Sequence, residues 1–145
     1  MDTVTILGTL CSSDIELPFF SSKVSAGFPS PAQDHMEQTL SLDELLDIDA
    51  PHTYLVRADG ESMTGAGILD GDVLVVSRAL TGRHGDVVIA AINGETFVKR
   101  LVVRGEEVVL QSEHPNYPPR YILEGDDFMI WGVVTDSIRR HRCHG

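Results

Sequence analysis

The chain has 145 residues, of which 42% are hydrophobic and 23% charged, so it can bury the core of about one domain. Its 22 acidic residues outnumber 11 lysines and arginines and give a net charge of −11, which disfavours direct, specific binding to DNA phosphates. No stretch approaches the roughly 18 consecutive apolar residues of a membrane helix, and the N-terminus lacks the pattern of a secretory signal. We therefore expect a cytoplasmic protein that does not enter a membrane.

The cysteines and histidines do not form a recognisable site. Cys11 and Cys143 lie near opposite ends of the chain, which argues against a disulfide framework. The six histidines are scattered, and neither a CxxC nor an HExxH motif is present. The sequence predicts no metal site and no cofactor.

Residues 1–50 have a different composition from the rest of the chain. They contain nine acidic side chains and one basic residue, Lys23. The stretch 19–32 is rich in Ser, Gly and Pro, so neither a helix nor a strand is expected to run through it. We expect an extended, mobile N-terminal arm with at most one short helix, which Ser41 would cap and in which Glu44 stands at the capping-box position.

From residue 51 onward the pattern is that of short strands separated by turns. Asn93-Gly94 is the strongest hairpin signal, because both central positions of a type I′ turn need a positive φ. The sequence predicts a mainly β fold, with a compact core of about seven short strands over residues 51–145. A basic tail, 139–145, follows the last strand and is expected to be solvated. The clearest predicted strands cover residues 54–58, 73–76, 87–92, 96–102, 108–110 and 128–134.

Lys99 lies within one of these predicted strands. Residues two apart share a face of a strand, so Phe97 and Leu101 flank the lysine. Such a lysine either extends its ammonium group into water along a packed stem, or is desolvated and becomes a neutral general base. The local pattern alone favours the first interpretation.

Ser62 follows a predicted strand and a glycine turn, in the order Gly60-Glu61-Ser62-Met63. This placement can present a hydroxyl together with a backbone N–H, which is the arrangement of a nucleophile beside an oxyanion hole. The same pattern also occurs in ordinary turns. His52 and His84 are candidate bases, but nothing in the local sequence favours either.

Taken in order, five segments resemble the peptidase core of the LexA/UmuD family of self-cleaving Ser-Lys peptidases. The resemblance implies the fold of that core, with Ser62 as nucleophile and Lys99, 37 residues later, as general base. It implies further that the backbone N–H groups of Ser62 and Glu61 form the oxyanion hole. The five segments are residues 60–63, 67–76, 85–90, 96–101 and 128–134.

The arm is similar to that of UmuD-type proteins, in its residues 17–20 and 26–32. That similarity implies self-cleavage of the Ala26–Gly27 bond, stimulated by a RecA filament on single-stranded DNA. It also implies a homodimer whose processed form is an accessory subunit of an UmuC-like Y-family polymerase in the translesion synthesis of the SOS response.

Three other interpretations remain. A non-catalytic module that regulates or contacts a polymerase could keep the fold without the chemistry. A repressor of the LexA type is disfavoured because no basic recognition helix can be drawn in residues 1–50. Signal peptidase I also uses a Ser-Lys dyad, but it needs a membrane anchor, which this sequence does not predict.

Overall fold

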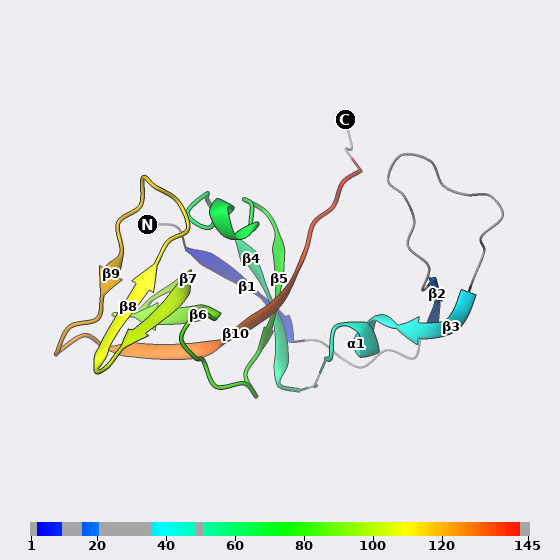
Figure 1. Cartoon of the computed structure of the whole chain (residues 1–145), viewed down its shortest axis with the longest axis horizontal. Helices are drawn as coiled ribbons and strands as arrows, with labels where there is room; N and C mark the ends of the chain where they lie inside the picture. Colours follow the sequence, from blue (N-terminus) through cyan, green and yellow to red (C-terminus); the bar gives the residue numbers. More distant parts are fainter. Residues whose placement is uncertain (1–2, 10–15, 21–35, 49–50, 143–145) are drawn as a thin grey trace. The chain divides into compact units, whose positions relative to one another are not determined.

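The computed structural model describes residues 3–9, 16–20, 36–48 and 51–142 (Figure 1). The chain divides into two compact units, one made of Met1–Leu10 with Asp49–Gly145 and the other of Cys11–Ile48. Among the described residues, no helix has the length and apolar character needed to cross a bilayer. The mainly β fold expected from the sequence is confirmed.

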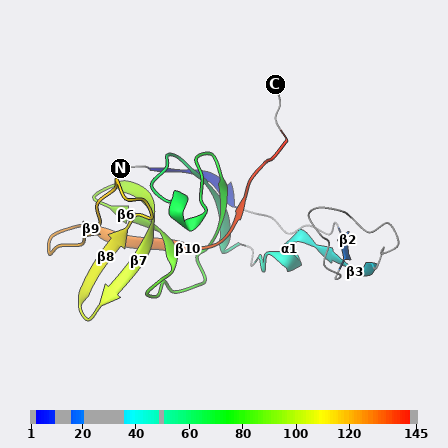
Figure 2. The same ribbon diagram turned by 45° about the horizontal axis from the view of Figure 1, so that its top comes forward.

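The larger unit is a single antiparallel sheet of eight strands, in the order β1-β4-β5-β10-β6-β7-β8-β9. Strand β10 runs from the β6 side of this sheet to the β5 side (Figure 1). Figure 2 shows the same ribbon turned by 45°. The strands are β1 (Val4–Thr9), β4 (Thr53–Ala58), β5 (Val73–Ser77), β6 (Val87–Ile92), β7 (Glu95–Arg104), β8 (Glu107–Gln111), β9 (Arg120–Tyr121) and β10 (Phe128–Ile138).

Two irregularities in β10 bend the sheet. The register shifts between Ile130 and Gly132 against β6, and between Val134 and Asp136 against β5. A Cβ on Gly132 would lie 2.6 Å from a methyl carbon of Val76, so only glycine allows β10 to approach β5 this closely. Such bulges add local twist, and here they let one sheet curl around its own core.

The core consists of two clusters, one on each side of β6 and β7. Val88 and Ala90 of β6 belong to one cluster, together with Phe97 and Leu101 of β7. Ile89, which points to the opposite face, belongs to the other cluster. Burial on both faces explains why β6 is a continuous apolar run rather than an alternating one.

Most predicted elements of the core are confirmed. The Asn93-Gly94 turn joins β6 to β7, with φ of 50° and 86° at its two residues, as a type I′ turn requires. Strand β1 was not predicted: it pairs with β4, so residues 4–9 belong to the core sheet rather than to an arm.

Two strands of the smaller unit were not predicted from the sequence. Strand β2 (Glu16–Phe20) pairs antiparallel with β3 (Met36–Ser41), although 15 residues separate them. Pairing over such a separation leaves no local signature in the sequence. The predicted short helix is confirmed as α1 (Leu42–Leu45), where Ser41 Oγ accepts a hydrogen bond from the N–H of Glu44 at 3.2 Å.

The basic tail is not simply solvated, because its first residue forms a buried ion pair. Arg139 donates to both carboxylate oxygens of Asp72, at 2.8 and 2.7 Å, and to the carbonyl oxygen of Gly67 at 2.8 Å. Asp72 is buried and also accepts from the N–H of Leu69. These hydrogen bonds, with that of Arg139 first, hold the pKa of Asp72 below its ordinary value.

Replacing Arg139 by Gln should destabilise the fold, because the buried carboxylate loses its charged partner. We expect the free energy of unfolding at pH 7 to fall, by less than the loss of a partner from a fully buried pair, because the guanidinium is partly exposed. A carboxyl group with a lowered folded-state pKa stabilises the protein above its unfolded pKa, and this contribution is lost as the pH falls through the folded pKa. The difference between variant and wild type should therefore shrink at pH 3. Urea denaturation at both pH values measures it, with Arg140→Gln, an exposed neighbour, as control. Equal losses in the two variants would contradict the assignment.

Candidate active site

Ser62 lies in the turn between β4 and the short 3-10 helix η1 (Thr64–Ala66), and only 2% of it is exposed. Two backbone hydrogen bonds bind this turn to the segment after β8. The N–H of Glu113 donates to the carbonyl oxygen of Ser62 at 2.9 Å, and the N–H of Gly65 donates to the carbonyl oxygen of Glu113 at 2.8 Å. A Cβ on Gly65 would lie 2.6 Å from that oxygen, so glycine is required at this close approach. The turn is thereby held in one place on both sides of the serine.

Lys99 lies in the middle of β7, and only 1% of it is exposed. Phe97 and Leu101 flank it on the same face, and both are buried. The interpretation that its head extends into water is therefore wrong. Instead, Lys99 Nζ donates a hydrogen bond to Ser62 Oγ, at 2.7 Å. The structure thus brings together the two side chains that the sequence separates by 37 residues.

The environment of Lys99 favours the neutral amine. Removing an ammonium ion from water costs several kcal/mol even after the protein relaxes. The ring of Tyr117 lies 5.9 Å from Nζ, near the outer limit for a cation–π interaction worth about 0.5–2 kcal/mol, which would favour the charged form. Desolvation disfavours the charged form, and the amine lies within hydrogen-bond distance of the Ser62 hydroxyl.

The loop after β8 forms an aromatic wall beside the Ser62–Lys99 pair. His114 packs edge-on against Tyr117, with 5.1 Å between ring centroids, and His114 Nδ1 accepts a hydrogen bond from the N–H of Asn116. Tyr117, His114 and Ser112 also line a cavity of about 310 Å³. Neither Ser62 nor Lys99 lines this cavity, so Tyr117 separates it from the two reactive side chains.

An ion pair that the sequence did not reveal links the two halves of the site. Arg100, next to Lys99 on β7, contacts Glu113 through Nε and Oε1 at 2.5 Å and donates to the carbonyl oxygen of Gly85 at 2.6 Å. Glu113 is the residue whose backbone holds the Ser62 turn. Neither Arg100 nor Glu113 belongs to a recognisable motif, and the two are 13 residues apart, so the sequence did not predict that they pair.

The remaining residues predicted for the site lie in different parts of the chain. Glu61 lies exposed in the same turn as Ser62, and its carbonyl oxygen accepts from the N–H of Thr64. His84 Nδ1 accepts a hydrogen bond from the N–H of Val103. His52 lies exposed just before β4, whereas Ser62 follows the end of that strand. Neither histidine is therefore placed as a base for Ser62. Ala26 and Gly27 lie outside the described residues. Within the described ranges, no three His, Cys, Asp or Glu side chains are grouped to hold a metal ion.

The model of the Peptidase S24-like family matches residues 18–135. The chain belongs to this family. It is a self-cleaving serine peptidase of the Ser-Lys type. It shares 43% identity over 126 residues with Protein MucA of Salmonella typhimurium, which covers 86% of each chain. It shares 44% identity over 126 residues with Protein ImpA of Shigella flexneri, which covers 86% of this chain and 85% of the relative.

The relatives also distinguish between the subfamilies considered from the sequence. The LexA repressor of Bordetella avium is 36% identical over 132 residues, which cover 91% of this chain but 61% of the repressor. Identity and mutual coverage are both higher for MucA and ImpA. The chain is accordingly an UmuD-type protein of SOS mutagenesis, as the arm and core motifs predicted.

Replacing Arg100 by Gln should slow self-cleavage by about tenfold or more, because Glu113 would no longer fix the Ser62 turn relative to β7, and small misplacements of reacting groups are costly. Stability should change by only about 1 kcal/mol or less, since both partners are about one-third exposed. Intact-mass time courses measure cleavage, and urea denaturation measures stability. Arg104→Gln, an exposed residue of the same strand, is the matched control. Equal cleavage rates for the two variants would exclude this positioning role.

Proposed function

We propose that Ser62 is the nucleophile and Lys99 the general base with which the chain cleaves its own Ala26–Gly27 bond. The observation that carries this proposal is the 2.7 Å separation of Lys99 Nζ and Ser62 Oγ at a buried position. Membership of a family of self-cleaving serine peptidases supports it independently. Of the chain's two lysines, Lys23 and Lys99, Lys99 is the one that lies in the core of residues 51–145.

The reaction follows from these two groups. Neutral Lys99 takes the proton of the Ser62 hydroxyl as Oγ forms a bond to the carbonyl carbon of Ala26. The backbone N–H groups of Ser62 and Glu61 stabilise the oxyanion of the tetrahedral intermediate. The bond to Gly27 then breaks, and Lys99 returns the proton to the departing amine. Water, deprotonated by Lys99, hydrolyses the ester and restores Ser62. The products are residues 1–26 and residues 27–145, the latter of 119 residues.

The proposed scissile bond suits such a site on chemical grounds. Ala26 is small enough to enter a narrow pocket beside the nucleophile. Gly27 has no Cβ, so the backbone can come close to the reacting groups. Pro29 and Pro31 bias the chain that follows toward an extended form, which can lie along a cleft.

Because each chain is its own substrate, cleavage occurs once per molecule and acts as a switch instead of repeated turnover. If the arm occupies the site only part of the time, the basal rate falls in proportion to that fraction. We propose that a RecA filament on single-stranded DNA stabilises the docked state and so triggers cleavage. The net charge of −11 is consistent with a protein that responds to DNA through another protein rather than by binding phosphates itself.

We propose further that the chain works as a homodimer in the cytoplasm, and that its processed form is the accessory subunit of an UmuC-like Y-family polymerase. These partners are supported by the similarity to MucA and ImpA.

The purified chain at about pH 10, where even a lysine whose pKa is only slightly lowered is substantially neutral, should convert with time to the fragment that begins at Gly27. Ser62→Ala and Lys99→Met should remain intact, because the first lacks the nucleophile and the second replaces the amine with an apolar chain of similar length. Intact mass identifies the bond from the fragment. Arg57→Gln, exposed on β4, is the control for an unrelated loss of charge.

Addition of RecA, single-stranded DNA and nucleotide at neutral pH should accelerate the same cleavage in wild type only. A wild-type chain that stays whole under both conditions would refute the proposal and favour a binding module that keeps the fold without the chemistry. Cleavage at another bond would refute only the assignment of Ala26–Gly27.

A further inference from the structure

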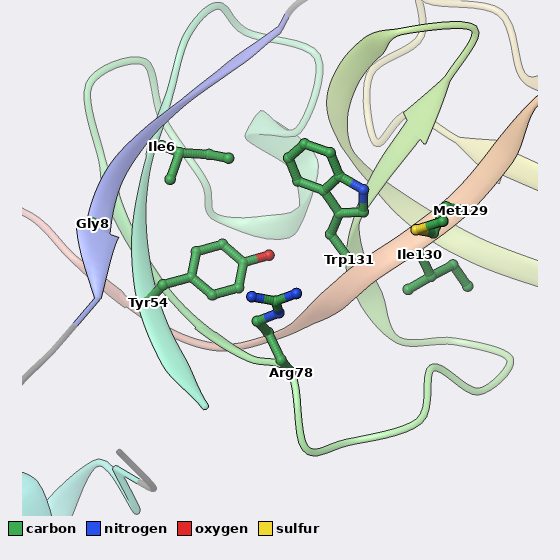
Figure 3. Close-up of a pocket in the computed structure, with 7 residues that line it drawn as sticks. All are labelled: Ile6, Gly8, Tyr54, Arg78, Met129, Ile130 and Trp131. Carbon is green, nitrogen blue, oxygen red and sulfur yellow. The ribbon is translucent and has the colours of Figure 1, made fainter. Parts of the chain in front are cut away.

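A second cavity, of about 500 Å³, lies on the β1 side of the sheet and shares no residue with the Ser62–Lys99 site (Figure 3). Tyr54, which contributes to it, stands near the start of β4, whereas Ser62 follows the end of that strand. Its volume is within the range of small-ligand pockets, about 300–1,000 Å³. The lining residues are Ile6, Gly8, Tyr54, Arg78, Met129, Ile130 and Trp131.

Trp131 enters this cavity because of a bulge. In the register of β10 against β6, Ile130 pairs with Ala90 and Gly132 pairs with Ile89, so Trp131 is the extra residue between two paired ones. A bulge redirects the side chain of the extra residue, and here the indole ring forms a wall of the cavity, as Figure 3 shows. The register of β1 against β4 also shifts, between Ile6 and Gly8, at the opposite rim.

The hydroxyl of Tyr54 is the unusual feature of the cavity. Tyr54 is 5% exposed, and its hydroxyl oxygen is buried with no hydrogen-bond partner among the described residues. An unpaired buried hydroxyl destabilises a fold, so a partner outside these residues is expected. Burial raises the pKa of Tyr54, although nearby Arg78 lowers it, so the hydroxyl keeps its proton at neutral pH and can donate.

Arg78 provides the second polar group. Its side chain is exposed and points into the same space as the Tyr54 hydroxyl (Figure 3). In the described part of the chain, no carboxylate lies within ion-pairing distance of its guanidinium. None of the described residues that line the cavity is acidic, although acidic residues outnumber basic ones two to one in the chain.

These features select one ligand chemistry. A hydroxyl donor and a single guanidinium match the two oxygens and one charge of a carboxylate, whereas a phosphate dianion would carry a second negative charge with no cation beside it in the described lining. Ile6, Ile130 and the ring of Trp131 offer apolar surface to the body of the ligand.

We propose that this cavity binds an apolar monocarboxylate, whose carboxylate is held by Arg78 and Tyr54 while its aromatic or aliphatic body packs against Trp131. The carboxylate can belong to a free organic acid or to a peptide, and the test below separates the two sources. This site is independent of the proposed self-cleavage, so either can fail without the other.

Trp131 is the single tryptophan of the chain, so its fluorescence reports on this cavity alone. The full-length protein is titrated with 3-phenylpropionate and, separately, with its amide. The peptide arm uses acetyl-Ala-Ala-Phe with a free C-terminus, against the same peptide amidated. Each carboxylate should bind saturably, and each amide about tenfold or more weakly, because the charge-assisted hydrogen bonds are lost. Binding by the peptide alone assigns the carboxylate to a peptide source, and binding by both shows that a free acid suffices.

Variants identify the groups that hold the carboxylate. Arg78→Gln should weaken binding about tenfold or more, and Tyr54→Phe about three- to tenfold. Tyr54→Phe should leave the unliganded chain as stable as wild type or more stable, because no hydrogen bond is lost on removal of the unpartnered hydroxyl. Arg57→Gln, an exposed arginine of β4 outside the cavity, should bind as wild type does.

Three results would overturn the proposal. Equal affinity for acid and amide would mark a merely apolar cavity. No saturable binding at millimolar concentrations would mean that no carboxylate site exists. A Trp131 emission that is shielded from soluble quenchers and insensitive to every ligand, in a chain that sediments as a dimer, would show that a second copy covers the cavity.

Discussion

The site depends on the burial of one amine. Lys99 lies on a strand whose two faces contribute to different core clusters, and its side chain ends 2.7 Å from Ser62 Oγ. The same burial that would destabilise an ammonium group makes the neutral amine a suitable base. A surface lysine beside a surface serine would have neither property. The curled sheet therefore supplies the position of the proposed base and the burial that disfavours its charged form.

Backbone hydrogen bonds hold the turn that carries the serine. Its turn is bonded on both sides to Glu113, and Glu113 is joined to Arg100, the neighbour of Lys99. Nucleophile and base thus share one support, which reduces their relative motion. A corresponding device fixes the next turn, where Arg139 binds the buried carboxylate of Asp72 across the sheet. Both ion pairs connect segments far apart in the chain.

Local features of the sequence were sufficient to predict much of the core. The run Val87–Ile92, the Asn93-Gly94 turn and the Ser41 cap each express a rule that operates within a few residues. The Ser62–Lys99 pair could be proposed only from a combination of segments, because the local pattern around Lys99 favoured a solvated side chain. Strands β1, β2 and β3 depend on long-range pairing that no short window of sequence reveals. The contacts of Arg100 and Arg139 were missed for the same reason.

A lysine that acts as the base must be a neutral amine near physiological pH, and ¹⁵N NMR of the side-chain nitrogens shows whether Lys99 is one. The chain labelled with ¹⁵N-lysine gives two Nζ signals, since Lys23 and Lys99 are its only lysines. The Nζ signal of Lys23 is the internal reference. If the Ala26–Gly27 bond is cleaved, Lys23 stays in the sample as part of the fragment of residues 1–26. We predict that Lys99 loses its proton at a clearly lower pH than Lys23, because burial disfavours the ammonium form. Two signals that titrate together near the ordinary lysine value, about 10.4, would contradict the account.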